Sequence, residues 1–281
     1  MVFKIGIILN LHEILKKIEN LSPLPETIVE IEKYKRKDEK EIDELNEIIN
    51  KDALLVTTIL KIANSAMFGF RSKVETPKRA ISLLGINFVI SVAISTASQR
   101  IIISSLSAYG LSNDDFKNSS SLSLALTSLW LNKLDPELKD SLLLATLLQD
   151  IGKFIISDVL ISNDKAKDFL KKLEDRSITI EEIEKDFFGF SSSYITAQIF
   201  KHWNLSSNLI NSIEFIDNPK IAPEDYKKKS MILDVIKTAT DIRNPLSQGS
   251  INKAIDKAKE YNLNYKSLEE AIKKLKNRIE K

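Results

Sequence analysis

The polar pair Gln149 and Asp150 is the clearest candidate for chemistry in this chain, because it ends a strongly apolar stretch. The segment Leu142–Lys153 reads Leu-Leu-Leu-Ala-Thr-Leu-Leu-Gln-Asp-Ile-Gly-Lys, a composition typical of a buried helix. A buried carboxylate needs a partner, since an unpaired charge away from water is strongly unfavourable. We therefore expect Asp150 either to pair with Lys153 or backbone donors, or to belong to a present or former metal site.

The helix that carries this pair has a predicted start and end. Asp135 is a suitable N-cap, Pro136 suits the first helical position, and Gly152 is a suitable stop, so the pattern predicts a helix over 136–151. In the last turn of such a helix, an ionised Asp150 would face the negative end of the helix dipole, at a cost of roughly 0.3–1 kcal/mol. The position therefore calls for a compensating group.

The available residue types narrow the chemistry. The chain has no cysteine, which excludes disulfides, thiolate metal sites and cysteine nucleophiles. Its two histidines are His12 and His202, and we expect His202, beside Trp203, to be structural or exposed to solvent. The serine runs at 119–121 and 191–193 lack the context of a nucleophile elbow. Any metal site would therefore depend mainly on carboxylates.

Composition indicates a balanced, water-soluble protein. The 281 residues include 41 basic and 39 acidic side chains, a net charge of +2 that provides no large basic field for nucleic acid. The best apolar stretch, Ile86–Ile103, is interrupted by polar residues, and the N-terminal apolar run is too short for a secretory signal. We expect a cytoplasmic protein without a membrane partner.

Helical spacing and capping signals predict an all-α fold, with residues 1–10 ambiguous between a short strand and a lead-in. Asp52 should cap a helix over Ala53–Ala63, after which Asn64 and Ser65 should hold the chain as it leaves the helix. The remaining helices are expected over Leu11–Glu19, from Glu26, from Ile42, Pro77–Leu84, Asn87–Ile103, Ser112–Asn132, Asp158–Asp175, from Thr179, Ser191–Trp203, from Ser206 or Ser207 to Ile216, Pro223–Ile242, Ser250–Tyr261 and Ser267–Ile279. Thr76 is expected to open the helix over Pro77–Leu84, and Asn87 to cap the helix that runs to Ile103. Capping boxes are expected at Ser112/Asp115, Thr179/Glu182 and Ser267/Glu270.

Several short motifs together resemble the HDOD family, the signalling-associated relatives of HD-domain metal phosphohydrolases. They are Leu24-Pro25, Ile49 with Asp52, Leu60–Ala66 with its Ala-Asn-Ser-Ala core, Val74, Ala80-Ile81, Leu84-Gly85, Leu147–Lys153, Gly189, Trp203-Asn204-Leu205, Pro219 and Thr240-Asp241. The resemblance implies a two-lobed HD-like helical architecture. Within it, we expect structural roles for the signature residues Pro25, Asp52, Asn64, Ser65, Gly85, Gly152 and Trp203.

The resemblance also implies which positions correspond to the metal ligands of catalytic HD proteins. Asn118 stands at the first histidine, Gln149 at the histidine of the His-Asp pair, and Ser192 at a later histidine. The His-His pair falls on Ile216 and Asp217, and the last ligand on Asp241. Of the family's ligands, this leaves the carboxylates of Asp150 and Asp241.

Two carboxylates do not supply the mixed nitrogen and oxygen ligands that suit a transition metal, although with waters they could weakly hold Mg²⁺. We therefore expect no metal, no cofactor and no catalytic residue. Asn118, Gln149 and Ser192 are expected to satisfy Asp150 and Asp241 through hydrogen bonds, so that a polar network replaces the ion.

The predicted organisation has a lead segment at 1–17, an HDOD domain at 18–242 with lobes at 18–107 and 111–242, and a C-terminal helical extension at 243–281. The predicted function is a non-enzymatic, bacterial-type signal-transduction module that binds a signalling protein or a small ligand.

Two alternatives remain open. The first is a divergent metal-dependent phosphohydrolase using Asp150 and Asp241. The second is nucleic-acid binding through the lysine-rich stretches 227–229 and 273–281. Such stretches are more often solvated helix faces, and we expect no nucleic-acid partner.

Overall fold

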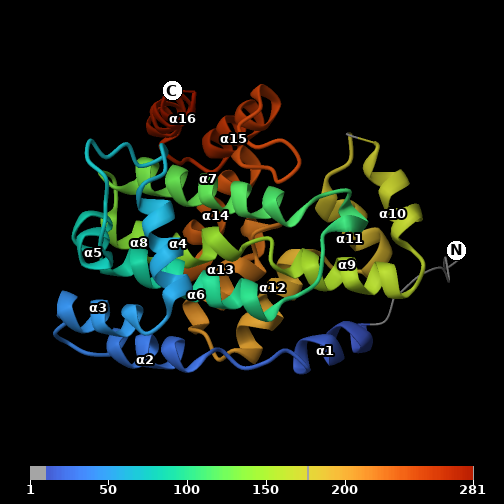
Figure 1. The fold of residues 1–281 in the computed structure, drawn as a ribbon. Coiled ribbons are helices and arrows are strands. Elements are labelled where there is room, and N and C mark those ends of the chain that lie inside the picture. The colour runs from blue at the N-terminus through green and yellow to red at the C-terminus, as the bar shows by residue number, and fades with distance from the viewer. Residues whose placement is uncertain (1–10, 176, 281) are drawn as a thin grey trace, which may run out of the picture. The chain divides into compact units, whose positions relative to one another are not determined.

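The computed structural model describes residues 11–175 and 177–280, in which every regular element is a helix (Figure 1). The predicted all-α class is therefore confirmed for this part of the chain. None of its helices is both long and apolar enough to span a membrane. The α-helices are α1 Leu11–Glu19, α2 Glu26–Lys35, α3 Ile42–Asn50, α4 Ala53–Ala63, α5 Pro77–Leu84, α6 Ile86–Ile101, α7 Asn113–Leu131, α8 Pro136–Leu148, α9 Gly152–Ser162, α10 Ala166–Leu173, α11 Ile180–Phe188, α12 Ser192–His202, α13 Ser207–Glu214, α14 Glu224–Ala239, α15 Gln248–Glu260 and α16 Tyr265–Ile279. Two short 3-10 helices, η1 Ser107–Tyr109 and η2 Pro219–Ile221, complete the set.

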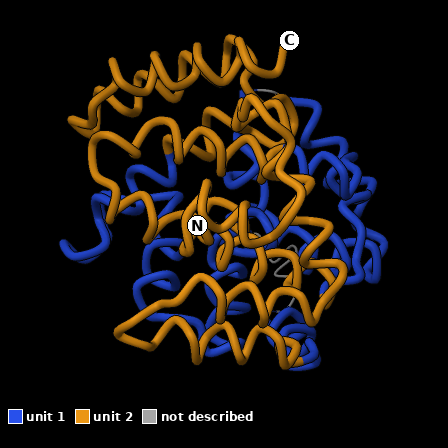
Figure 2. The backbone as a smooth tube through the Cα atoms, turned by 60° about the vertical axis from the view of Figure 1, so that its left-hand side comes forward, with its two compact units in different colours: residues 1–22, 102–118, 149–234 blue, residues 23–101, 119–148, 235–281 orange. Residues whose placement is uncertain are grey.

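The chain forms two compact units, each assembled from three separate segments (Figure 2). Unit 1 contains the described parts of residues 1–22, 102–118 and 149–234. Unit 2 contains residues 23–101, 119–148 and the described part of 235–281. The segment Leu142–Lys153 therefore contributes to both units.

Unit 2 is built around two apolar helices, α6 and α8, which pack against each other. Seven consecutive residues of α8, Leu142–Leu148, are buried, as expected of a helix without a polar face. The start of α4 is fixed by Asp52, whose carboxylate accepts hydrogen bonds from the backbone N–H groups of Leu54 and Leu55 at 2.9 and 3.2 Å. The other carboxylate oxygen lies 2.6 Å from the guanidinium of Arg100 on α6, so Asp52 joins two helices of this unit.

Unit 1 is centred on α9, which packs against α12 and α1. Nearly all of α9 from Gly152 to Leu160 is buried. Beside it, the rings of Tyr109, Phe169 and Phe187 make edge-to-face contacts with centroid distances of 4.9 and 5.2 Å. Such contacts stabilise a core beyond the burial of apolar area alone.

Most of the predicted capping residues are confirmed. Asp135 accepts a hydrogen bond from the Leu138 N–H at 3.0 Å, Thr76 caps α5, and Thr179 with Glu182 forms a capping box at α11. Ser112 and Asp115 also exchange the hydrogen bonds of a capping box before α7. These signals act within one helical turn, which makes them readable from sequence.

Other predicted boundaries are wrong. The helix predicted over 136–151 ends at Leu148, and Gly152 begins α9 instead of stopping α8. The helix predicted over 158–175 is two helices, α9 and α10, separated by a turn in which Asp164 has a positive φ of 54°.

Two predicted caps are also wrong. Asn87 lies inside α6, where it donates to Asp140 at 2.9 Å, and α16 is capped by Asn264, which accepts from the Ser267 N–H at 3.0 Å. Asn264 lies three residues before the predicted cap Ser267, and both residue types suit a cap, so local sequence could not separate them. The ambiguity over residues 1–10 lies outside the described residues.

Candidate functional site

Asp150 pairs with Lys153 at the turn between α8 and α9. The Asp150 Oδ1 atom lies 3.2 Å from Lys153 Nζ, and the two side chains are 6% and 1% exposed. Of the alternatives left open by the sequence, the structure shows the pairing with Lys153. Since α9 begins at Gly152, Asp150 also precedes a helix N-terminus, whose dipole favours a carboxylate and offsets the opposing dipole of α8.

Several oxygen atoms surround the Lys153 ammonium group. Besides Asp150, it lies 2.8 Å from Ser192 Oγ, 3.2 Å from Glu184 Oε1 and 3.5 Å from Glu181 Oε1. We call these five residues the Lys153 cluster. A buried lysine is tolerated when charge partners and hydrogen-bond acceptors replace its water shell, as they do here.

Glu184 anchors this cluster from α11. Its side chain is fully buried, and it accepts hydrogen bonds from the Tyr109 hydroxyl at 2.8 Å and the Ser192 N–H at 2.6 Å. Burial raises the pKa of Tyr109 well above its usual value, and the negative charge of Glu184 raises it further. Tyr109 therefore stays protonated and able to donate.

Sequence reasoning missed Glu184. A signal was available, because Glu184 follows the buried Ile180 by four residues and precedes the buried Phe188 by four, which places it on the apolar face of α11. A charged residue on a buried face calls for a partner, but its identity depends on contacts with α9 and α12.

Gly152 allows α9 to approach α12 closely. A Cβ atom on Gly152 would lie 2.2 Å from the Ser192 carbonyl oxygen and 2.8 Å from the Thr196 backbone nitrogen. The Gly152 N–H donates to Thr196 Oγ1 at 3.0 Å. Glycine is therefore required here for space, and this contact places Ser192 beside Lys153.

The other expected positions in unit 1 have different surroundings. Gln149 is buried, and its backbone oxygen lies 3.3 Å from Thr196 Oγ1. Asn118 is exposed on α7. Asp217 accepts hydrogen bonds from the hydroxyls of Ser191 and Ser193. The Lys153 cluster thus contains Asp150 and Ser192 but not Asn118.

Asp241 belongs to unit 2, where Arg243 neutralises it. The Asp241 carboxylate accepts from the Arg243 backbone N–H at 2.9 Å, from Nε at 3.3 Å and from Nη2 at 3.1 Å. The expected partners of both carboxylates were neutral amides and hydroxyls. Instead, Asp150 and Asp241 each lie beside a cationic side chain.

These surroundings do not fit the metal centre that the HD resemblance implies. Among residues 11–175 and 177–280, no group of three or more His, Cys, Asp or Glu side chains is arranged to hold a metal ion. The carboxylates of Asp150, Glu181 and Glu184 instead surround an ammonium group that takes part in ion pairs with all three.

The family-signature residues have local structural contacts. Asn64 accepts a hydrogen bond from the Val74 N–H at 2.8 Å and donates to the Val74 carbonyl at 2.8 Å, and so closes the loop after α4. Gly85 ends α5 with a positive φ of 95°, and Pro25 precedes α2. Trp203 donates to the Ser22 carbonyl at 3.2 Å.

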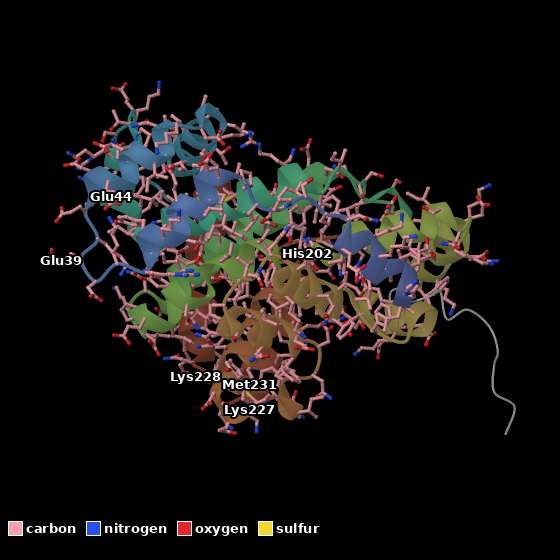
Figure 3. All side chains as sticks on the ribbon, turned by 90° about the horizontal axis from the view of Figure 1, so that it is seen from below. Glu39, Glu44, His202, Lys227, Lys228 and Met231 are labelled. Carbon is pink, nitrogen blue, oxygen red and sulfur yellow. The ribbon has the colours of Figure 1, made fainter. Side chains whose placement is uncertain are left out.

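His202 ends α12 beside the chain that leaves α1 (Figure 3). Its Nε2 atom lies 3.0 Å from the carbonyl oxygen of Leu21. With the bond from Trp203 to Ser22, this contact fastens residues 21–22 to α12 within unit 1. A structural position for His202 agrees with the sequence analysis.

The lysine run at 227–229 forms part of α14, and Figure 3 shows Lys227 and Lys228 at the surface. Lys227 lies 3.4 Å from Glu224, and Lys229 contacts the side chain of Asn208. At least part of the run is therefore engaged in contacts within the protein, which weakens the case for a phosphate-binding surface.

Comparison with known proteins places this arrangement in a family. The chain spans 40% of an uncharacterized protein from Treponema pallidum (strain Nichols), with 24% identity over 220 residues, or 75% of this chain. Among solved structures, it resembles a virulence factor from Campylobacter jejuni, with 27% identity, a TM-score of 0.58 and coverage of 95% of this chain and 98% of the other.

Two further structures show the same fold at lower identity. A protein from Shewanella amazonensis SB2B, named as a candidate phosphohydrolase, has 20% identity and a TM-score of 0.72, with 96% of this chain and 99% of the other covered. An HDOD domain protein of unknown function from Geobacter sulfurreducens has 14% identity and a TM-score of 0.68, with 96% of each chain covered. The HDOD domain itself matches residues 21–219. The chain therefore belongs to the HDOD family.

Proposed function

We propose that this protein is a non-catalytic, cytoplasmic signal-transduction module that acts by binding a signalling protein or a small ligand. The observation that supports a non-catalytic role is the position of Lys153. Its buried ammonium lies among the carboxylates of the HD-like site, where it supplies the positive charge that a metal ion would otherwise supply.

An ammonium group cannot replace the chemistry of a catalytic metal. A metal in a hydrolase polarises the phosphoryl oxygen and lowers the pKa of a bound water, and both effects need an open coordination position. The Lys153 ammonium has no such position, and its contacts with Asp150, Glu184 and Ser192 hold it in place.

Displacement of Lys153 by a divalent cation is also unfavourable. Removing one partner from a buried ion pair typically costs about 3–5 kcal/mol, because the remaining charge loses its compensation. A metal would have to recover this free energy from oxygen ligands alone, without the histidine nitrogens that catalytic relatives supply. The cluster therefore suits a fixed structural role better than reversible metal binding.

Metal content and hydrolysis test this proposal. Protein purified without chelator should contain far less than one equivalent of Mg, Mn, Fe or Zn, as measured by inductively coupled plasma mass spectrometry. It should not hydrolyse bis-p-nitrophenyl phosphate above buffer when each metal is added. Asp150→Asn is the matched variant, because it would abolish a genuine metal-dependent activity.

One stoichiometric metal, or a turnover that Asp150→Asn removes, would establish the phosphohydrolase alternative and refute the proposal. Turnover that is unchanged by Asp150→Asn would indicate a contaminating hydrolase, and a further purification step would then have to remove it.

A further inference from the structure

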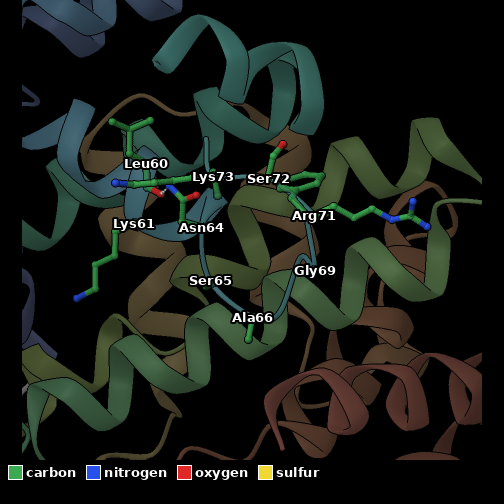
Figure 4. Close-up of a pocket in the computed structure, with 11 residues that line it drawn as sticks. Leu60, Lys61, Asn64, Ser65, Ala66, Gly69, Arg71, Ser72 and Lys73 are labelled. Atoms are coloured by element: carbon green, nitrogen blue, oxygen red, sulfur yellow. Dashed lines mark hydrogen bonds between the residues drawn. The ribbon is translucent and has the colours of Figure 1, made fainter. Parts of the chain in front are cut away.

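A pocket in unit 2 lies between the end of α4 and the loop that follows it, residues 65–73 (Figure 4). We call it the α4 pocket. Its volume is about 540 Å³, within the range of roughly 300–1,000 Å³ typical of small-molecule sites. It belongs to a different unit from the Lys153 cluster, so an inference about it does not depend on the proposed non-catalytic function.

The charge of the α4 pocket has one sign. Its ionisable lining residues are Lys61, Arg71 and Lys73, with no acidic residue among them. All three are exposed, and none forms an ion pair within the described part of the chain. In Figure 4, Lys61 and Lys73 extend to the same side of the loop and Arg71 to the other. In a chain with almost equal numbers of acids and bases, this concentration favours an anionic ligand.

The carbonyl groups at the end of α4 would oppose an anion, but two of them are capped. The Leu60 carbonyl accepts hydrogen bonds from the Asn64 backbone N–H at 3.0 Å and from Asn64 Nδ2 at 2.8 Å. The Ile62 carbonyl accepts from the Ser65 N–H at 3.0 Å. Lys61, in the last turn, further offsets the negative end of the helix dipole.

Three further lining residues, Ser65, Phe70 and Leu60, add polar and apolar surface. The Ser65 hydroxyl oxygen is buried and has no hydrogen-bond partner among the described residues. A buried polar atom without a partner is unusual in a native protein, and an enclosed water is a common explanation. Phe70 and Leu60 provide apolar surface at the same pocket, which an inorganic ion alone would not use.

The loop around the pocket is held in place before any ligand binds. Asn64 bridges it to Val74 with two hydrogen bonds of 2.8 Å. From α16, Arg278 Nη1 donates to the Met67 carbonyl at 2.7 Å. Gly69 has a positive φ of 63°, and a Cβ on it would lie 3.1 Å from Arg278 Nε. A preformed loop lowers the entropic cost of binding.

From these observations we infer that the α4 pocket binds a small organic phosphate. A phosphate monoester carries about −1.5 to −2 charges at pH 7 and several strong acceptor oxygens, which the exposed ammonium groups of Lys61 and Lys73 can satisfy. The organic part of the ligand packs against Phe70 and Leu60. The pocket is thus a ligand site separate from the HD-like centre.

The test measures binding of AMP, ribose 5-phosphate and glycerol 3-phosphate by isothermal titration calorimetry, with inorganic phosphate and adenosine as partial ligands. At least one organic phosphate should bind saturably and more tightly than either partial ligand. Lys61→Gln/Lys73→Gln should weaken that binding by about tenfold or more, because two charge-assisted contacts are lost. Amide NMR signals of Ala63, Ser65 and Gly69 should shift on titration.

The matched control is Lys266→Gln, which removes one exposed positive charge from the same unit. Lys266 is twelve residues before Arg278, about 18 Å away along the axis of α16. Circular dichroism should show that all variants are folded, since the substituted side chains are exposed. The inference fails if no organic phosphate saturates the protein, if inorganic phosphate or adenosine binds as tightly, or if Lys266→Gln weakens binding as much as the double variant.

Discussion

Replacing Lys153 by methionine should strongly destabilise unit 1. Methionine keeps much of the side-chain length but removes the charge, so the carboxylates of Asp150 and the fully buried Glu184 lose their shared cation. From values for buried ion pairs, the free energy of unfolding should fall by about 3–5 kcal/mol. The cost arises because buried charges without compensation cannot recover their hydration.

A second substitution separates charge loss from packing loss. Glu184→Gln removes one of the uncompensated charges while keeping an oxygen that accepts from Tyr109. Lys153→Met/Glu184→Gln should therefore be less destabilised than the sum of the two single variants, with a coupling of about 1–3 kcal/mol. Lys17→Met is the matched control, because its pair with Asp158 is 27% and 41% exposed. It should change stability by less than about 1 kcal/mol.

Urea unfolding monitored by tryptophan fluorescence provides the assay. The chain has two tryptophans, Trp203 in unit 1 and Trp130 in unit 2. In a Trp130→Phe background, the remaining signal reports on the unit that contains the Lys153 cluster. A loss for Lys153→Met as small as that for Lys17→Met would refute the view that Lys153 is an essential internal cation.

Three further predictions concern other contacts. Gly152→Ala should destabilise the protein by at least about 3 kcal/mol or prevent folding, because its Cβ would overlap the Ser192 carbonyl; a midpoint in urea near the wild-type value would contradict this. Burial raises the pKa of Asp52, but the Arg100 hydrogen bond and charge and the backbone donors together lower it overall. The stability that ionised Asp52 contributes is therefore present above its unfolded pKa of about 4 and is lost as pH falls through the lower folded pKa. Arg100→Ala should therefore make the thermal midpoint fall less steeply as the pH is lowered. If the midpoint falls as steeply as in the wild type, the Asp52–Arg100 pair does not contribute to the acid dependence. Arg278→Ala should increase amide hydrogen exchange in residues 66–73 but not in α9. If residues 66–73 exchange at the same rate in the variant and the wild type, Arg278 does not hold this loop in place.

Local signals explain which parts of the fold could be predicted. The N-caps Asp52, Thr76 and Asp135 were predicted correctly because each bonds backbone groups two or three residues away. Gly152 was misread as a stop because glycine commonly ends helices, whereas its role here is to avoid a clash with α12, some forty residues later. Contacts over such distances leave no local pattern.

In the candidate site, too, local sequence identified some residues and long-range contacts determined the others. The sequence pointed to Asp150 and gave Lys153 as one of its two alternatives for a partner. It did not point to Glu184, which belongs to the Lys153 cluster, or to Tyr109, which donates to Glu184 from another element. Expected hydrogen bonds from Asn118 depended on correspondence with catalytic relatives, and in this chain that residue is exposed. The residue types alone indicated which side chain could be charged and buried, whereas its partners could be identified only from the fold.

The two units divide the chain in a way that affects how it could be dissected. Two of the boundaries between the units, at 118/119 and 234/235, fall inside single helices, α7 and α14. The last segment is fastened to unit 2, since Trp130 donates to the Asn264 carbonyl at 3.1 Å and Arg278 holds Met67. No single truncation can therefore release one unit whole, and removing α15 and α16 would strip unit 2 of part of its own framework.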